Sequence, residues 1–312
     1  MPLFDAYIFV DWSARNFSHP LLETENAVWV GKLIPGDNLQ EENYHRTRFD
    51  GFANITSCLL DQVKKRRRIL VGFDFPYGYP TGFASALDLQ TGTESWRSVW
   101  AKLTEKVVDS NNNQNNRFVA AGELNTILGN GNPGPFWGHP VGYNINNLQA
   151  TSPGFPFNAR GNVQLKRLRI VESRLTRNGI QETWQLFGRG SVGSQALVGI
   201  PYVYKLLRHV GLDTISRVWP FETQFTTTPS CNRGPFILHA EIWPGLVNQR
   251  TQELTANVWI RDRAQVRIMC QWAAECDNEG TLGQFFERPN GLDQQQVQSC
   301  IEEEGWILGV SE

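Results

Sequence analysis

Three apolar runs of this chain each end at or near an acidic residue, and this pattern limits the possible folds more than any other feature. The first run, "AYIFVD", ends at Asp11, and the second, "ILVGFD", ends at Asp74. The third, "FILHAEIW", contains Glu241 close to its end. Runs of this length and composition predict buried strands of an α/β protein. Because parallel strands bring their carboxyl ends to one edge of the sheet, where ligands bind, we expect these three carboxylates to converge.

The segments around these runs predict the other elements of an α/β fold. "NAVWVGKL" predicts a strand antiparallel to the first, since the connection between them is short. Apolar residues recur at helical spacing from about Thr47 to Arg68 and from about Asp262 to Cys276. "SQALVGIPYVYKLLRHVG" predicts a helix interrupted near Pro201, and "LDQQQVQSCIEEEG" predicts another helix near the C-terminus. "ETWQLF" and "ISRVWPFET" predict two further strands.

Residues 109–162 differ from the rest of the chain in being rich in Asn, Gly and Pro. Structureless loops of this length are uncommon in compact domains and are usually functional or disordered. The interspersed aromatic residues, among them Phe136, Trp137 and Tyr143, argue against plain disorder. We therefore expect an irregular insertion folded over one end of the sheet, within a single domain that spans residues 1–312.

Composition and charge exclude several classes of protein. The net charge of -2 gives no overall attraction to nucleic acid or to anionic membranes. No uncharged apolar run approaches the ~20 residues that a membrane span needs, and the N-terminus does not resemble a signal peptide. Five cysteines, an odd number with no CxxC pair, argue against a disulfide framework or a structural zinc site. We expect a cytoplasmic protein that is not associated with a membrane.

The predicted acids would repel one another strongly at a distance of a few ångströms unless a proton or a cation lay between them. Mg²⁺, or Mn²⁺ in its place, is the cation that we expect, because it prefers hard oxygen ligands. A fourth acid, Asp262, lies seven residues before Met269 and so continues the apolar stripe of a predicted helix. The helix dipole also favours an acid in the first turn, which is a simpler explanation for Asp262.

Three further residues are secondary candidates for the site. His239 and Glu241 alternate on the same face of their strand, so they project together, as a base or metal ligand and its neighbour would. Glu222 in "WPFET" competes with Glu241 for the third acidic position. Ser13 belongs to "VDWS", which could form a first phosphate loop.

Two segments are candidates for binding phosphate groups. "GRGSVGS" at residues 188–194 precedes a predicted helix and could hold a phosphate on backbone amides, although it lacks the lysine of a P-loop. The basic residues of 166–177 could contact nucleic acid, and a solvated face is an equally good explanation for them.

Several of these motifs, taken in order, are similar to those of a known family. The motifs are "YIFVDWSA", "VGFDFPYGYP", "GSVGSQALVGIP", "VWPFET" and "HAEIWP". Together they resemble a family of bacterial proteins grouped as domain of unknown function 429 and its relatives. The matching positions are Asp11, Asp74, Pro76, Gly78, Pro80, Glu241 and Pro244. The resemblance implies a ribonuclease H-like mixed sheet flanked by helices, from whose minimal core the insertion at 109–162 departs.

For activity, the resemblance implies a nuclease role by analogy of fold. In ribonuclease H-like enzymes, strand-end carboxylates hold two Mg²⁺ ions, one beside the attacking water and the other beside the leaving oxygen. By this analogy Asp11 would bridge the ions and Asp74 and Glu241 would complete the site. Asp262 would be the last acid, which it matches by placement only.

The function predicted from the sequence is therefore that of a divalent-metal-dependent nuclease or phosphoryl-transfer enzyme, with nucleic acid or nucleotide as its partner. Two alternatives stay open, because a fold does not establish an activity. One is a binding protein that keeps the ribonuclease H-like fold without catalysis, with the insertion as its contact surface. The other is an actin-like ATPase relative.

Overall fold

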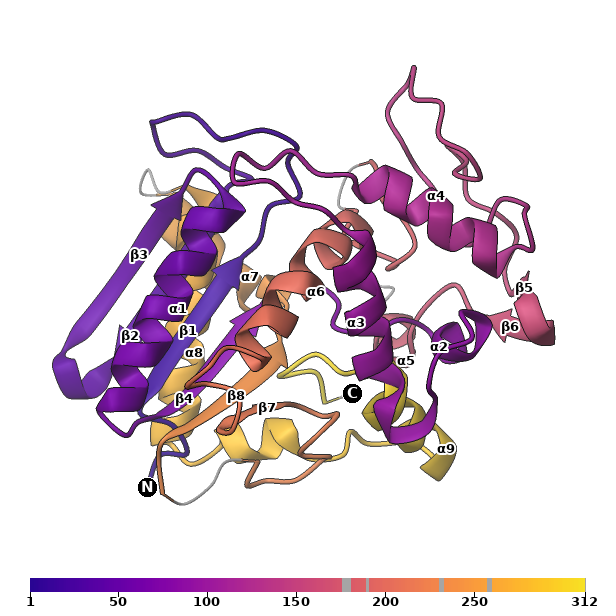
Figure 1. Ribbon diagram of the computed structural model, residues 1–312. Helices are drawn as coiled ribbons and strands as arrows, with labels where there is room; N and C mark the ends of the chain where they lie inside the picture. Colours follow the sequence, from indigo (N-terminus) through magenta and orange to yellow (C-terminus); the bar gives the residue numbers. More distant parts are fainter. Residues whose placement is uncertain (176–180, 189–190, 230–232, 257–259, 312) are drawn as a thin grey trace.

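The computed structural model describes residues 1–311 except 176–180, 189–190, 230–232 and 257–259 (Figure 1). In this part of the chain, helices flank both faces of a mixed β-sheet, so the predicted α/β class is confirmed. None of the described helices has the length and apolar surface that crossing a bilayer requires.

The described residues form a six-stranded sheet with the order β3-β2-β1-β4-β8-β7. The strands are β1 (Ala6–Asp11), β2 (Val28–Ile34), β3 (Leu39–His45), β4 (Arg68–Phe73), β7 (Ser216–Val218) and β8 (Phe236–Glu241). β2 is antiparallel to β1 and β3, whereas β1, β4, β8 and β7 run parallel to one another. Because β1, β4 and β8 are parallel neighbours, their carboxyl ends lie at one edge of the sheet.

Side chains on the two faces of β1 enter two different layers of the core. Ile8 and Val10 belong to the layer that packs against α1, α3 and α6, and Tyr7 and Phe9 belong to the layer that packs against α8. These helices are α1 (Arg48–Lys64), α3 (Ser95–Lys106), α6 (Gly193–Leu207) and α8 (Arg261–Asn278). Figure 1 shows α1 and α6 in front of the sheet and α8 behind it. Burial of both faces explains why β1 and β4 are continuously apolar rather than alternating.

The region 109–162 is more regular than the sequence predicts. The elements in and next to it are α4 (Arg117–Leu128), β5 (Phe157–Ala159) and β6 (Val163–Leu165), of which β5 and β6 pair with each other. The ring of Phe136 lies 5.7 Å from that of Tyr79, centroid to centroid, within the α1–α3–α6 layer of the core. The prediction of an irregular insertion is therefore wrong over α4, because the flanking Asn-rich and Gly-rich segments hide its apolar spacing.

Other elements also depart from the expectations. α6 continues through Pro201 instead of breaking there. "ETWQLF" is not a strand, because Gln185 makes only an isolated bridge with Trp137. β3, with the sequence "LQEENYH", is a half-buried and mostly polar strand at the sheet edge, so apolar patterning does not predict it.

The C-terminal segment fixes the turn that follows β4. The remaining short helices are α2 (Phe83–Ala86), α5 (Ile170–Arg174), α7 (Asn248–Thr255) and α9 (Gln294–Ser299), the last of which continues into a π-helical turn. In the π-helical turn (Cys300–Glu304), the Glu303 carboxylate accepts hydrogen bonds from the backbone N–H groups of Gly82 and Ala84, which follow β4. A Cβ at Gly78 would lie 2.2 Å from the carbonyl oxygen of Glu303, so this close approach requires glycine. The "FPYGYPTG" turn is thus held in place from the opposite end of the chain.

Candidate active-site cleft

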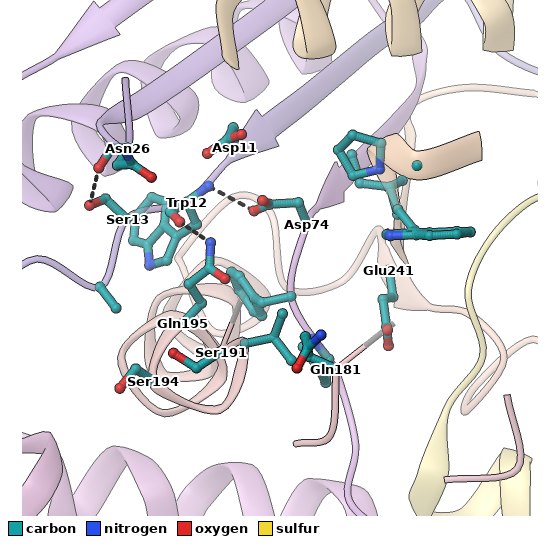
Figure 2. Close-up of a pocket in the computed structure, with 18 of the residues that line it drawn as sticks. Asp11, Trp12, Ser13, Asn26, Asp74, Gln181, Ser191, Ser194, Gln195 and Glu241 are labelled. Carbon is teal, nitrogen blue, oxygen red and sulfur yellow. Dashed lines mark hydrogen bonds between the residues drawn. The ribbon is translucent and has the colours of Figure 1, made fainter. Parts of the chain in front are cut away.

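A cleft of about 1460 Å³ opens at the carboxyl ends of β1, β4 and β8 (Figure 2). All four acids predicted from the sequence lie on its wall, namely Asp11, Asp74, Glu241 and Asp262. They come from three strand ends and from the first turn of α8. The four side chains nevertheless have two different kinds of environment.

Asp11 and Asp74 lie side by side (Figure 2). The backbone N–H of Trp12 donates to Asp74 Oδ1 at 2.7 Å, and Gln195 Nε2 donates to the Trp12 carbonyl oxygen at 2.5 Å. Asp262 accepts a bond from the backbone N–H of Asn26 at 2.5 Å. The Asp11 side chain, in contrast, is 8% exposed and has no hydrogen bond or ion pair within the part of the chain that the structure describes. These three aspartates are called the aspartate cluster below.

Burial and mutual repulsion both favour the protonated forms of the aspartate cluster. Burial raises the pKa of Asp11 well above its usual range, and the negative charges of Asp74 and Asp262 raise it further. Burial likewise raises the pKa of Asp74 to about 7, although the Trp12 N–H opposes this shift. Burial also raises the pKa of Asp262. The positive charge of Arg261 opposes these shifts in the pKa of Asp11 and Asp262 but does not cancel them.

Glu241 has the opposite environment. Its two carboxylate oxygens accept from Arg169 Nη1 at 2.8 Å and Nη2 at 2.6 Å, in a bidentate ion pair. The backbone N–H of Tyr77 donates to Glu241 Oε2 at 2.9 Å. Figure 2 shows the Glu241 carboxylate pointing away from Asp11 and Asp74. The expectation that Glu241 completes an acidic metal site therefore needs correction: it reaches the same cleft, but an arginine binds its carboxylate.

Arg169 is itself held on all sides. It is fully buried, its Nε donates to Glu172 Oε1 at 2.8 Å, and its Nη1 donates to the Glu304 carbonyl at 2.9 Å. Burial lowers the pKa of Arg169, but the carboxylates of Glu241 and Glu172 outweigh that effect and raise it on balance. Among the basic residues of 166–177, Arg169 is thus an internal cation and not a nucleic-acid contact. Arg177 lies outside the described residues.

The structure separates two of the secondary candidates from the aspartate cluster. His239 is fully buried, burial lowers its pKa to about 3, and its Nε2 lies 3.4 Å from Ser216 Oγ; it is not part of the cleft wall. Glu222 forms an ion pair with Arg97 at 2.8 Å and lines a separate cavity of about 340 Å³. Of the two competitors for the third acidic position, Glu241 is therefore the one in the cleft.

Ser13 lies in the cleft wall, but its hydroxyl is not activated. Ser13 Oγ donates to the carbonyl of Asn26 at 2.6 Å and lies 3.1 Å from His19 Nε2. Arg15 Nη1 lies 3.3 Å from His19 Nδ1, and because a guanidinium only donates, Nδ1 must be the unprotonated nitrogen. Nε2 then carries the proton and donates to Ser13. His19 is therefore in the wrong tautomer to remove a proton from this serine.

Basic residues that the sequence patterns did not single out also line the cleft. They are Arg15, Arg117 and Arg261. Arg117 donates to Ser194 Oγ and to Asn115 Oδ1, both at 2.9 Å, and makes no salt bridge to a carboxylate of the described residues. Burial and the charge of Arg48 lower the pKa of Arg117 to about 10, so it is positive at neutral pH. Part of the "GRGSVGS" segment lines the cleft as well, but residues 189–190 lie outside the described residues.

Within the described part of the chain, no group of three or more His, Cys, Asp or Glu side chains is arranged so that it could hold a metal ion. Comparisons with protein-family models, with curated proteins and with solved structures each find no match to this chain.

Proposed function

We propose that this protein has a ribonuclease H-like fold and is a divalent-metal-dependent enzyme that hydrolyses or transfers phosphate esters of a nucleic acid or nucleotide. The fold proposal is supported by a mixed sheet in which β2 runs against its neighbours, with helices on both faces. It is also supported by the acids at the carboxyl ends of adjacent parallel strands, where α/β proteins bind their ligands.

A single observation carries the proposal for function: the buried Asp11 carboxylate has no partner among the described residues and lies beside two other aspartates. A buried carboxylate without a partner is unstable as an anion, so it takes up either a proton or a cation. Mg²⁺ typically uses only one or two protein carboxylates and completes its shell with water and phosphate oxygens. The aspartate cluster fits that requirement, although it is not a preformed cage.

Each part of the cleft has a role in this proposal. Asp11 and one of its neighbours, Asp74 or Asp262, would hold the cation, which when bound acts as a Lewis acid and lowers the pKa of water. The Trp12 N–H orients the Asp74 carboxylate, and Gln195 Nε2 donates to the carbonyl oxygen of the same Trp12. Arg117, fixed by Ser194, supplies a positive charge to an anionic substrate.

The experiment combines calorimetry with an assay of phosphodiester hydrolysis. We expect Mg²⁺ or Mn²⁺ to bind the wild type, and the bound cation to be required for cleavage of bis(p-nitrophenyl) phosphate or of labelled RNA and DNA. Asp11→Asn should abolish cation binding and lower the rate by roughly 100-fold or more, because the charge that holds the ion is lost. Asp88→Asn is the matched control, since Asp88 is exposed, lies outside the cleft and has a backbone φ of 61° that asparagine tolerates.

The outcomes separate the three functional hypotheses. Wild-type cation binding no stronger than that of an Asp11→Asn/Asp74→Asn double variant would contradict the metal-dependent enzyme. Cation binding without hydrolysis of any phosphodiester would favour the binding protein. Stabilisation of the protein by ATP in a thermal-shift assay would favour the ATPase relative.

A further inference from the structure

We propose that Arg169 is a built-in cation that occupies the place of a second metal ion, so that the cleft binds one divalent cation instead of two. This inference rests on the proposed function and concerns the number of ions in the same site. Its basis is the difference between Glu241, which is paired by the chain itself, and Asp11, which is not.

Both carboxylate oxygens of Glu241 already accept hydrogen bonds. Both of its oxygens accept from Arg169, and one of them also accepts from the Tyr77 N–H. The side chains of Arg169 and Glu241 are only 1% and 3% exposed. A metal ion could use Glu241 only after the guanidinium had left, and this would place a buried positive charge next to a dication.

The Arg169 guanidinium is held in place by hydrogen bonds to several segments of the chain. Four hydrogen bonds from its guanidinium end on the Glu241 carboxylate, Glu172 and the Glu304 carbonyl. Its backbone N–H also donates to Glu172 Oε2 at 2.9 Å. Glu304 belongs to the C-terminal turn that holds the segment after β4. Arg169 is therefore anchored by three segments and is not a side chain that swings away when a ligand enters.

The aspartate cluster supplies the carboxylates that a metal ion in the cleft would bind. Without Glu241, the carboxylates of the aspartate cluster remain, and none of these three makes a salt bridge to an arginine of the described residues, although the charge of Arg261 acts on Asp11 and Asp262 from farther away. A two-ion centre needs a carboxylate shared by both ions and further ligands for each of them. Asp74 and Asp262 each already accept a backbone N–H, and a single hydrated ion needs only one or two carboxylates.

The experiment counts bound Mn²⁺ by calorimetry and by electron paramagnetic resonance of the intact chain. We expect one Mn²⁺ per wild-type chain. Asp11→Asn should weaken binding by more than the roughly 10–100-fold that is typical of losing an outer-shell partner. Glu241→Gln should leave both the number of ions and the affinity unchanged. Neither readout depends on turnover.

A second pair of variants tests the arginine directly. Arg169→Gln leaves Glu241 without its cation, so this variant should bind a second Mn²⁺ and its melting temperature should depend on Mn²⁺ more strongly than that of the wild type. Arg169→Gln/Glu241→Gln should return to one ion.

Two ions in the wild type, or an affinity loss in Glu241→Gln as large as that in Asp11→Asn, would overturn the inference and leave the proposed function intact. No bound ion in the wild type would overturn both. If Arg169→Gln does not fold, the wild-type count and the Glu241→Gln affinity still decide the question.

Discussion

Two groups of buried acids line one cleft, but only one of the two groups is paired with a buried arginine. Around Arg169, the chain provides a guanidinium, a backbone N–H and fixed neighbours for Glu241 and Glu172. In the aspartate cluster, Asp11 is also buried, but its side chain has no hydrogen bond within the described residues. A carboxylate at a strand end is thus not a functional group by position alone. Its partners decide whether it is structural or available to a ligand.

The two groups of acids also differ in how they affect the stability of the folded chain. A buried ion pair compensates each charge with its partner, whereas buried carboxylates that repel one another destabilise the folded chain when they are ionised. Charge that the chain does not balance is typical of a site that an external cation completes. The predictions below test this contrast.

The largest effect should come from removing the internal cation. Arg169→Gln leaves Glu241 and Glu172 buried without a counter-charge, so we expect a loss of about 3–5 kcal/mol in the free energy of unfolding. Urea denaturation in metal-free buffer measures it. The control is Arg250→Gln: the side chains of this arginine and of its partner Glu275 are 40% and 53% exposed, so the loss should stay below about 1 kcal/mol. Equal losses in the two variants would mean that the buried pair has no special role.

A smaller effect should appear in the pH dependence of stability. The pKa of Asp74 rises from 3.8 to about 7 on folding, so the folded protein binds more protons than the unfolded chain between these values. This contribution to stability is complete below pH 3.8 and is lost as the pH rises to about 7.

Asp74→Asn should therefore flatten the pH profile and make the metal-free protein more stable at pH 8 by roughly 1–3 kcal/mol. Thermal or urea unfolding between pH 5 and 8 provides the comparison, with Asp88→Asn as the unchanged control. A variant that is less stable than the wild type at pH 8 would show that the aspartates are compensated after all.

The smallest effect should come from the serine beside the cluster. Ser13→Ala removes a hydroxyl that bonds to the Asn26 carbonyl, which should cost about 1 kcal/mol of stability and leave phosphodiester hydrolysis within about tenfold of the wild type. His19 cannot act as its base in the tautomer that Arg15 imposes. A loss of activity as great as that of Asp11→Asn would instead identify Ser13 as a nucleophile, and phosphate-ester kinetics of both variants make this comparison.

Local sequence patterns predicted the parts of the site that lie on regular elements. Apolar runs ending in acids located β1, β4 and β8 and therefore Asp11, Asp74 and Glu241. Helical spacing located Asp262 at the start of α8. α4, in contrast, was hidden by its Asn-rich and Gly-rich surroundings.

The partners of these acids could not be predicted in the same way. Arg169 is 72 positions from Glu241, and Glu304 is 223 positions from Thr81, to which it bonds. No period along a strand or a helix connects residues at such separations. Gln195 and Arg117 reach the cleft from α6 and α4, and their polar character alone does not distinguish them from surface residues.

Side-chain periodicity and chain direction are local properties, so the amino-acid sequence is enough to predict which strands are buried and that their acids reach one edge of the sheet. Which of those acids is balanced by an arginine, and which has no side-chain partner among the described residues, can be seen only in the folded chain. The physical reason is that the energy of a buried charge depends on the atoms within a few ångströms of it, and folding brings those atoms from distant parts of the chain.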